Sequence, residues 1–206
     1  TQWFEMNLLD ELGETYKDSA KDVHNLVRFI GKKPLKPAPY KWAIPFVAGI
    51  VERMHSGTKQ VLLQTRWQPN ADSLYSGTLE FPAGVLDKPY ENIYDAVARE
   101  IKEEAGLTLK SIKGDSRTAV HSPNSSDEIF AFRPFCCTQQ LKDGRPWAGF
   151  IFVCEVEDEE PTAQLSETRD PQWLSVDEVR AIYEKSPEKL FGLELPAWEY
   201  YLKESS

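Results

Sequence analysis

The segment from Glu91 to Ala105 most constrains the fold, because it combines an apolar stripe with a cluster of carboxylates. The apolar residues recur at every fourth position, as on one face of an α-helix, at Ile93, Val97, Ile101 and Ala105. Gly106 follows and is expected to end the helix. A helix over about 91–105 must bury this stripe against another layer, so the chain needs a sheet or further helices to pack on it.

The acidic side of this helix carries Glu100, Glu103 and Glu104, which at positions i, i+3 and i+4 emerge on one face. Like charges at these spacings cost about 0.2–0.5 kcal/mol per pair, a cost that Mg²⁺ or Mn²⁺ would relieve because both ions favour carboxylate oxygens. Arg99 lies beside Glu100, where its guanidinium could hold a carboxylate in one orientation. The alternative is a solvated helix surface without chemistry.

Short β-like runs precede and follow the acidic helix. They cover Trp42–Glu52, Gln60–Arg66, Thr78–Phe81, Lys110–Ala119, Glu128–Gln139 and Gly149–Glu157. Ser175 and Glu178 have the spacing of a capping box and predict a helix to about Lys185, and a last short helix is expected after Pro196. Strands on both sides of one strong helix indicate an α+β fold, a mixed sheet with helices packed on it.

The first 40 residues differ from the rest in the pattern of their apolar residues and prolines. Residues 3–30 have helical spacing of apolar residues, and prolines at 34, 37 and 39 predict an extended connector. We therefore predict two parts: 1–40, a helical N-terminal extension with a Pro-rich connector, and 41–206, the main domain including the C-terminal helices. An interaction arm is one role open to the extension.

Composition argues against two classes of partner. A net charge of -9 disfavours extended nucleic acid. Mean hydropathy is -0.49, and no apolar run approaches the roughly 18 residues of a membrane span. The three cysteines form neither a disulfide framework nor a CxxC zinc motif, and no signal-peptide pattern is visible, so a cytoplasmic location is the default expectation.

The residues that frame the acidic helix resemble the Nudix box, Gly-x5-Glu-x7-Arg-Glu-U-x-Glu-Glu-x-Gly-U, where U is a bulky aliphatic residue. This chain has Gly84-x6-Glu91-x7-Arg99-Glu100-Ile101-x-Glu103-Glu104-x-Gly106-Leu107. The departure is one extra residue between Gly84 and Glu91, which alters the loop path but not the helix register. The resemblance implies a Nudix-type α/β/α sandwich with a mixed β-sheet, in which residues of about 42–185 form the family domain.

The same resemblance implies a Nudix hydrolase that cleaves a phosphoanhydride with Mg²⁺ or Mn²⁺. The metal ligands that it implies are Glu100, Glu103, Glu104 and a backbone carbonyl of Ala83 or Gly84. Arg99 joins the catalytic set. The general base stays open among Glu103, Glu128, the acidic run Glu157–Glu160 and Glu167.

Two flanking segments resemble the ADP-ribose and nucleoside-diphosphate-sugar pyrophosphatase branch of this family. They are Leu79–Gly84, like the entry to that branch's box, and Ser122–Glu128, like its downstream loop, with Asn124 in place of a glycine. An ordinary polar turn is the alternative for the second segment. The expected partner is a small nucleoside diphosphate derivative, with an ADP-ribose-like substrate favoured. Coenzyme A or (deoxy)nucleotide pyrophosphohydrolysis, a non-catalytic nucleotide sensor and a homodimer stay open.

Overall fold

The computed structural model describes residues 43–70, 74–115, 128–142, 144–163 and 168–205, together with the backbone of 118–121. Residues Trp42–Ser206 form one compact unit. The helices expected within 3–30 and the connector of 31–40 lie outside the described residues, so the proposed division at residue 40 stays a prediction.

A mixed β-sheet forms the centre of the described residues. Its strands are β1 (Ile44–His55), β2 (Thr58–Arg66), β3 (Leu79–Glu80), β4 (Ala83–Val85), β5 (Leu109–Ile112), β8 (Cys136–Gln139), β9 (Trp147–Val156) and β10 (Thr168–Ser175). The main order is β10-β2-β1-β9-β5, with β3 on β2, β4 on β1 and β8 on β9. Only the β1–β9 pair of this sheet is parallel. Strands β6 (Thr118–His121) and β7 (Glu128–Ala131) form a separate antiparallel pair.

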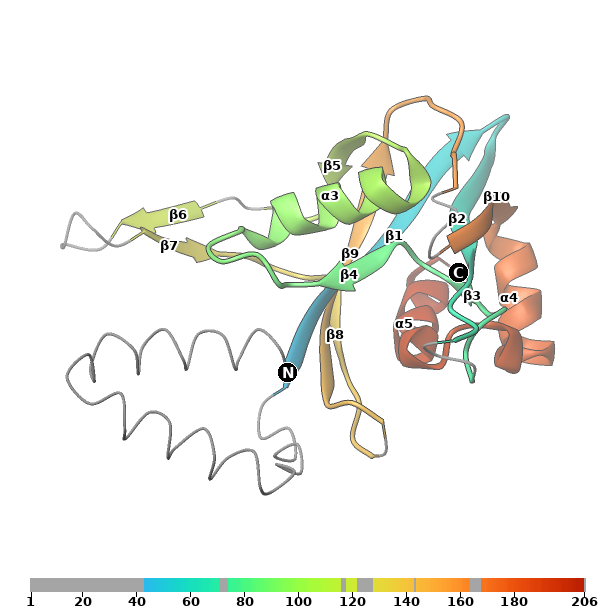
Figure 1. Cartoon of the computed structure of the whole chain (residues 1–206). Helices are drawn as coiled ribbons and strands as arrows, with labels where there is room; N and C mark the ends of the chain where they lie inside the picture. Colours follow the sequence, from blue (N-terminus) through green and yellow to red (C-terminus); the bar gives the residue numbers. More distant parts are fainter. Residues whose placement is uncertain are drawn as a thin grey trace, which may run out of the picture. The chain divides into compact units, whose positions relative to one another are not determined.

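Helices cover both faces of the sheet, because alternate residues of its central strands point to opposite sides. Val47 and Val51 of β1 pack with α3 (Ile93–Ala105) in one core. Ala48 and Ile50 pack on the other side with α4 (Val176–Lys185) and α5 (Leu195–Glu204). Figure 1 shows α3 on one side of the sheet and the two later helices on the other. The predicted α+β sandwich is confirmed.

Short-range signals set the helix ends, and the sequence predicts the end of α3 and the beginning of α4. Asn92 caps α3 by accepting hydrogen bonds from the backbone N–H groups of Tyr94 and Asp95. Gly106 ends α3 with a φ of 70°, in the left-handed region that glycine adopts without a Cβ penalty. The capping box of Ser175 and Glu178 opens α4.

The strand predictions were wrong in two respects. The runs predicted as 110–119 and 128–139 are each two strands, separated by a turn at Gly114 and by Pro134, respectively. Strands β4 and β10 were not predicted. Strand β10 contains Pro171, an irregular register between Arg169 and Gln172 and a left-handed φ of 48° at Asp170, so it lacks an alternating apolar pattern.

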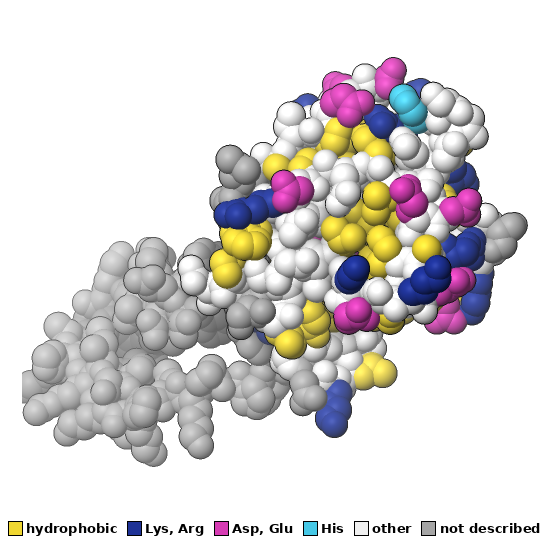
Figure 2. Space-filling view, turned by 90° about the vertical axis from the view of Figure 1, so that its right-hand side faces the viewer, with side chains coloured by type: hydrophobic (Ala, Val, Ile, Leu, Met, Phe, Trp, Pro, Cys, Tyr) yellow, Lys and Arg dark blue, Asp and Glu magenta, His cyan; other side chains and the backbone are white. Residues whose placement is uncertain are grey.

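None of the helices in the described part of the chain is long and apolar enough to cross a membrane. Figure 2 shows acidic and basic side chains interspersed on the face in view, with hydrophobic side chains between them. That face therefore offers no continuous basic surface for a phosphate backbone.

Candidate metal and catalytic site

Gly84 lies directly against Glu100. Strand β4 pairs with β1, which places Gly84 opposite Val47, beneath helix α3. A Cβ atom on residue 84 would lie 2.0 Å from Cδ of Glu100, whereas real Cβ contacts essentially never fall below 3.0 Å. A glycine is thus needed for the Glu100 carboxylate to reach the loop before the helix.

Burial perturbs the Glu100 carboxylate, which is 8% exposed. The loss of hydration raises the pKa of Glu100, and the charges of Glu103 and Asp87 add to this effect, while Arg99 opposes it. Negative charge at this position is therefore held at a free-energy cost, and a nearby cation would stabilise it.

Glu104 is fixed by two hydrogen bonds to the same oxygen. The backbone N–H of Ala83 donates to Oε2 at 2.9 Å, and Nε2 of Gln64 donates to it at 2.6 Å. Burial raises the pKa of Glu104 to about 8, and the nearby Glu80 charge adds to the rise, while the two hydrogen bonds oppose it. Within the described residues, Oε1 of Gln64 is buried without a hydrogen-bond partner. Glu104 is thus a carboxylate held in one orientation, close to the negative charge of Glu80 and the oxygen of Gln64.

Arg99 connects the beginning of the box to its glutamates. Its Nε and Nη2 donate to the two oxygens of Glu91, at 2.8 and 3.0 Å. Its Nη1 donates to Glu100 at 2.5 Å and to Glu103 at 3.2 Å. The hydrogen bonds from Arg99 lower the pKa of Glu91. Tyr90, in the loop that holds the extra residue, has a left-handed φ of 62°, and Glu91 reaches Arg99 despite the insertion.

Glu103 differs from the other two glutamates because half of its side chain is exposed. It can therefore turn toward a ligand without disturbing the core. In this structure Arg99 donates hydrogen bonds to both Glu103 and Glu100. Among the described residues, no three acidic, His or Cys side chains are arranged around a common metal position.

The residues nevertheless fit a hard divalent cation. Their donors are carboxylate and carbonyl oxygens, as Mg²⁺ and Mn²⁺ prefer. The buried charge of Glu100 and Glu104 needs compensation, and the missing Cβ of Gly84 opens the space beside Glu100. Ala83 and Gly84 border these carboxylates, Ala83 through its backbone N–H to Glu104 and Gly84 through its missing Cβ beside Glu100.

The candidates for the general base are scattered. Glu128 is exposed on β7, in the separate two-stranded sheet. In the acidic run, Glu159 accepts a hydrogen bond from the backbone N–H of Thr108, and Glu160 pairs with Arg53. Glu167 lies outside the described residues.

The sequence did not predict a role for three buried polar residues near the site. They are Gln64, Glu80 and Glu194, all at least 97% buried. Arg66 pairs with Glu80 at 3.0 Å, and the backbone N–H of Phe81 donates to both oxygens of Glu194. Each residue interrupts an apolar run, as in Val61–Thr65 and Leu193–Leu195, which is the sequence signal that could have identified it.

Comparison with known families gives one match. The sequence profile of the NUDIX domain family matches residues 43–192, well over half of the chain. No curated protein matches the chain.

Solved structures of the same fold agree with this match. A NUDIX hydrolase from Nitrosomonas europaea is 22% identical with a TM-score of 0.51, covering 79% of this chain and 90% of its own. A MutT protein from Methanosarcina mazei Go1 is 19% identical with a TM-score of 0.55, covering 82% and 99%. The NUDIX domain of Shewanella oneidensis NrtR, solved with ADP ribose, is 13% identical with a TM-score of 0.54, covering 87% and 98%. At these identities the likeness shows the fold.

Proposed function

This chain belongs to the NUDIX domain family and is a Nudix hydrolase, and from that premise we propose that it cleaves the phosphoanhydride of a nucleoside diphosphate linked to another group. Mg²⁺ or Mn²⁺ is the proposed cofactor. The proposed ligands are Glu100, Glu103, Glu104 and a backbone carbonyl of Ala83 or Gly84. The observation that carries the proposal is the contact of both buried glutamates with this loop, Glu100 against Gly84 and Glu104 on the Ala83 amide.

The chain's own groups have distinct roles in this reaction. When bound, the divalent cation neutralises charge on the diphosphate and makes a water a better nucleophile. Glu104, held by Ala83 and Gln64, would supply a fixed ligand oxygen, and the half-exposed Glu103 would complete the ligand set. Arg99 holds Glu100 in orientation and is itself held by Glu91. Attack of the water at phosphorus breaks the anhydride bond and releases two phosphate monoesters.

Glu167 is our preferred general base. It directly precedes Thr168, which is 1% exposed and whose Oγ1 donates to the backbone carbonyl of Glu104 at 3.4 Å. Thr168 thus lies at the C-terminal end of the helix that carries the three glutamates, and the proposal for Glu167 rests on its place before Thr168 in the sequence. Glu167→Gln should lower kcat by about 10²–10⁴-fold. The matched control is Glu128→Gln, since Glu128 is exposed on β7. A larger loss in the Glu128 variant would reverse the assignment.

An ADP-ribose-like substrate is favoured on two grounds. The segment Leu79–Gly84 resembles the entry of the ADP-ribose branch, and a structure of the same fold holds ADP ribose. From ADP-ribose itself the expected products are AMP and ribose 5-phosphate.

A product screen with Mg²⁺ and with Mn²⁺ tests the proposal. The substrates are ADP-ribose, NADH, a diadenosine polyphosphate, a sugar nucleotide, coenzyme A and a deoxynucleoside triphosphate, each with an EDTA control. We expect metal-dependent turnover, fastest with ADP-ribose. Faster turnover of coenzyme A or a triphosphate would replace the substrate class. Metal and nucleotide binding without any turnover would instead indicate a nucleotide sensor.

A further inference from the structure

Glu194 is a fully buried carboxylate that the proposed reaction does not use. It is 1% exposed, and its two oxygens accept a hydrogen bond from the backbone N–H of Phe81, at 3.1 and 3.0 Å. Burying a carboxylate is costly unless it makes compensating contacts. Burial, followed by the charge of Glu80, raises the pKa of Glu194 well above its ordinary value. An apolar residue would avoid this cost, so an acceptor at this position is expected to have a role of its own.

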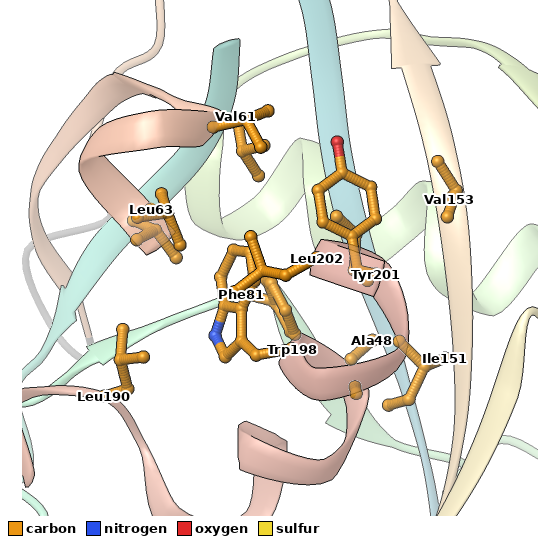
Figure 3. Close-up of a cluster of buried hydrophobic side chains, with 14 of the residues drawn as sticks. Ala48, Val61, Leu63, Phe81, Ile151, Val153, Leu190, Trp198, Tyr201 and Leu202 are labelled. Atoms are coloured by element: carbon orange, nitrogen blue, oxygen red, sulfur yellow. The ribbon is translucent and has the colours of Figure 1, made fainter. Parts of the chain in front are cut away.

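The segment that carries Glu194 docks along strand β3. Leu190 forms a parallel bridge with Leu79, and the backbone N–H of Phe191 donates to the Leu79 carbonyl at 2.8 Å. The next contact in this series is the one from Phe81 to Glu194. Figure 3 shows Leu190, Phe81 and Trp198 in one buried cluster, and the rings of Phe81 and Trp198 lie 4.5 Å apart. Residues 190–198 therefore hold the chain at Leu79 and Phe81, directly before Ala83 and Gly84.

Phe81–Gly84, here called the ligand loop, is fixed at successive points. Glu194 accepts from Phe81, the Pro82 carbonyl accepts from the Gly49 N–H at 3.0 Å, and Glu104 accepts from Ala83. Two of these anchors are carboxylates that reach the loop from different elements, α3 and the 3₁₀ turn Gly192–Glu194. The anchor on Phe81 stands two residues before Ala83, where a displacement would carry directly into the proposed ligand carbonyls.

We propose that Glu194 is a positioning residue that holds the ligand loop, and with it the backbone carbonyls of Ala83 and Gly84, in place for the divalent cation. This inference rests on the proposed function. The family profile ends at residue 192, so Glu194 lies beyond the matched range and belongs to a part of the chain that the family match does not assign. The C-terminal segment thus supports the metal site, in addition to covering the core.

Four variants of the full chain test the role. Glu194→Met keeps the length of the side chain but removes the acceptor, and Glu194→Asp retracts the acceptor by one methylene. Glu194→Gln keeps an acceptor oxygen and removes the charge. Glu199→Gln is the matched control, because Glu199 lies on α5, about half exposed, in a surface pair with Lys203. The readout is the Mn²⁺ dissociation constant, measured by electron paramagnetic resonance on protein whose circular dichroism shows it to be folded.

We expect the Met and Asp variants to bind Mn²⁺ at least 10-fold more weakly than wild type, the range found when groups that support metal ligands are lost. The Gln variant should stay within about threefold of wild type, and the control should be unchanged. Where substrate turnover is measured, kcat should fall in the Met and Asp variants more than KM rises.

Two results would overturn the inference. One is a Mn²⁺ affinity within twofold of the control for both Met and Asp, or for Asp alone when the Met variant does not fold. The other is a Gln variant as weak as Met, which would show that charge matters and the acceptor does not. Failure of the proposed function is distinguishable from both, since wild-type protein would then bind no Mn²⁺, or would bind it and turn over no substrate.

Discussion

Replacing Gly84 by alanine tests the geometry of the proposed metal site at one carbon atom. The new Cβ would lie 2.0 Å from Cδ and Oε1 of Glu100 and 2.3 Å from Oε2. To reach 3.0 Å, below which real Cβ contacts essentially do not occur, the carboxylate must retreat by about 1 Å or more. The carboxylate is the end of a flexible side chain, so it can move without disrupting the core.

The expected effect falls on catalysis more than on stability. A displacement of about 1 Å in a reacting arrangement costs about 10²-fold in rate, or roughly 2.7 kcal/mol of activation free energy. We therefore expect kcat of Gly84→Ala to fall about 100-fold at saturating Mg²⁺. The free energy of unfolding should fall by about 1–2 kcal/mol at most, because the relocated group is a side-chain end and the contact it strains is the hydrogen bond from Arg99.

Steady-state kinetics and urea unfolding measure the two quantities. The matched control is Gly49→Ala, which adds a methyl group against the same helix, 3.0 Å from Cδ1 of Ile101, without approaching a glutamate, and keeps the backbone N–H that donates to Pro82. The control should lose about 1–3 kcal/mol of stability through overpacking and keep its kcat. A folded Gly84→Ala protein with wild-type kcat would refute the reasoning, because Glu100 would then not need its position against the loop.

Three further predictions concern the surrounding contacts. Arg99→Lys cannot reproduce the two hydrogen bonds that Arg99 makes with Glu91. It should lower kcat about 10–100-fold in steady-state kinetics and the free energy of unfolding by about 2 kcal/mol in urea. A wild-type kcat in this variant would show that Arg99 has no role in the site. The raised pKa of Glu194 means that the folded protein keeps a proton that the unfolded chain releases near 4.5, so stability should fall as pH rises above that value. Glu194→Gln should flatten this fall in urea titrations between pH 5 and pH 8, and parallel curves would contradict it. Ser175→Ala should cost about 1 kcal/mol by removing the helix cap on Glu178 while kcat is unchanged.

The sequence predicted best those features that depend on residues close together in the chain. The end of α3 and the beginning of α4 followed from Gly106 and from the capping box at Ser175, since caps and breakers act within a few residues. The buried face of α3 followed from its periodicity. The clustering of Glu100, Glu103 and Glu104 required only the geometry of a helix.

Features that depend on tertiary packing were not predictable in the same way. Gln64 and Glu194 lie 40 residues before Glu104 and 113 residues after Phe81, their hydrogen-bond partners, and no local pattern reports such pairing. Strand β4 was read only as the loop before the helix, because three residues are too short for a periodicity signal. A lone polar or charged residue within an apolar run is a weak signal for a buried anchor, but it was present at both positions.

The central claim is that the glutamates of α3 hold the divalent cation that the reaction needs. The most direct test is the initial rate of hydrolysis as a function of Mg²⁺ concentration for wild type and for Glu103→Gln combined with Glu104→Gln. We expect a saturable Mg²⁺ dependence in wild type, which EDTA abolishes. In the folded double variant we expect a loss of at least about 10³-fold in rate that excess Mg²⁺ does not restore. A double variant that turns over substrate at the wild-type rate, with the same Mg²⁺ dependence, would contradict the account.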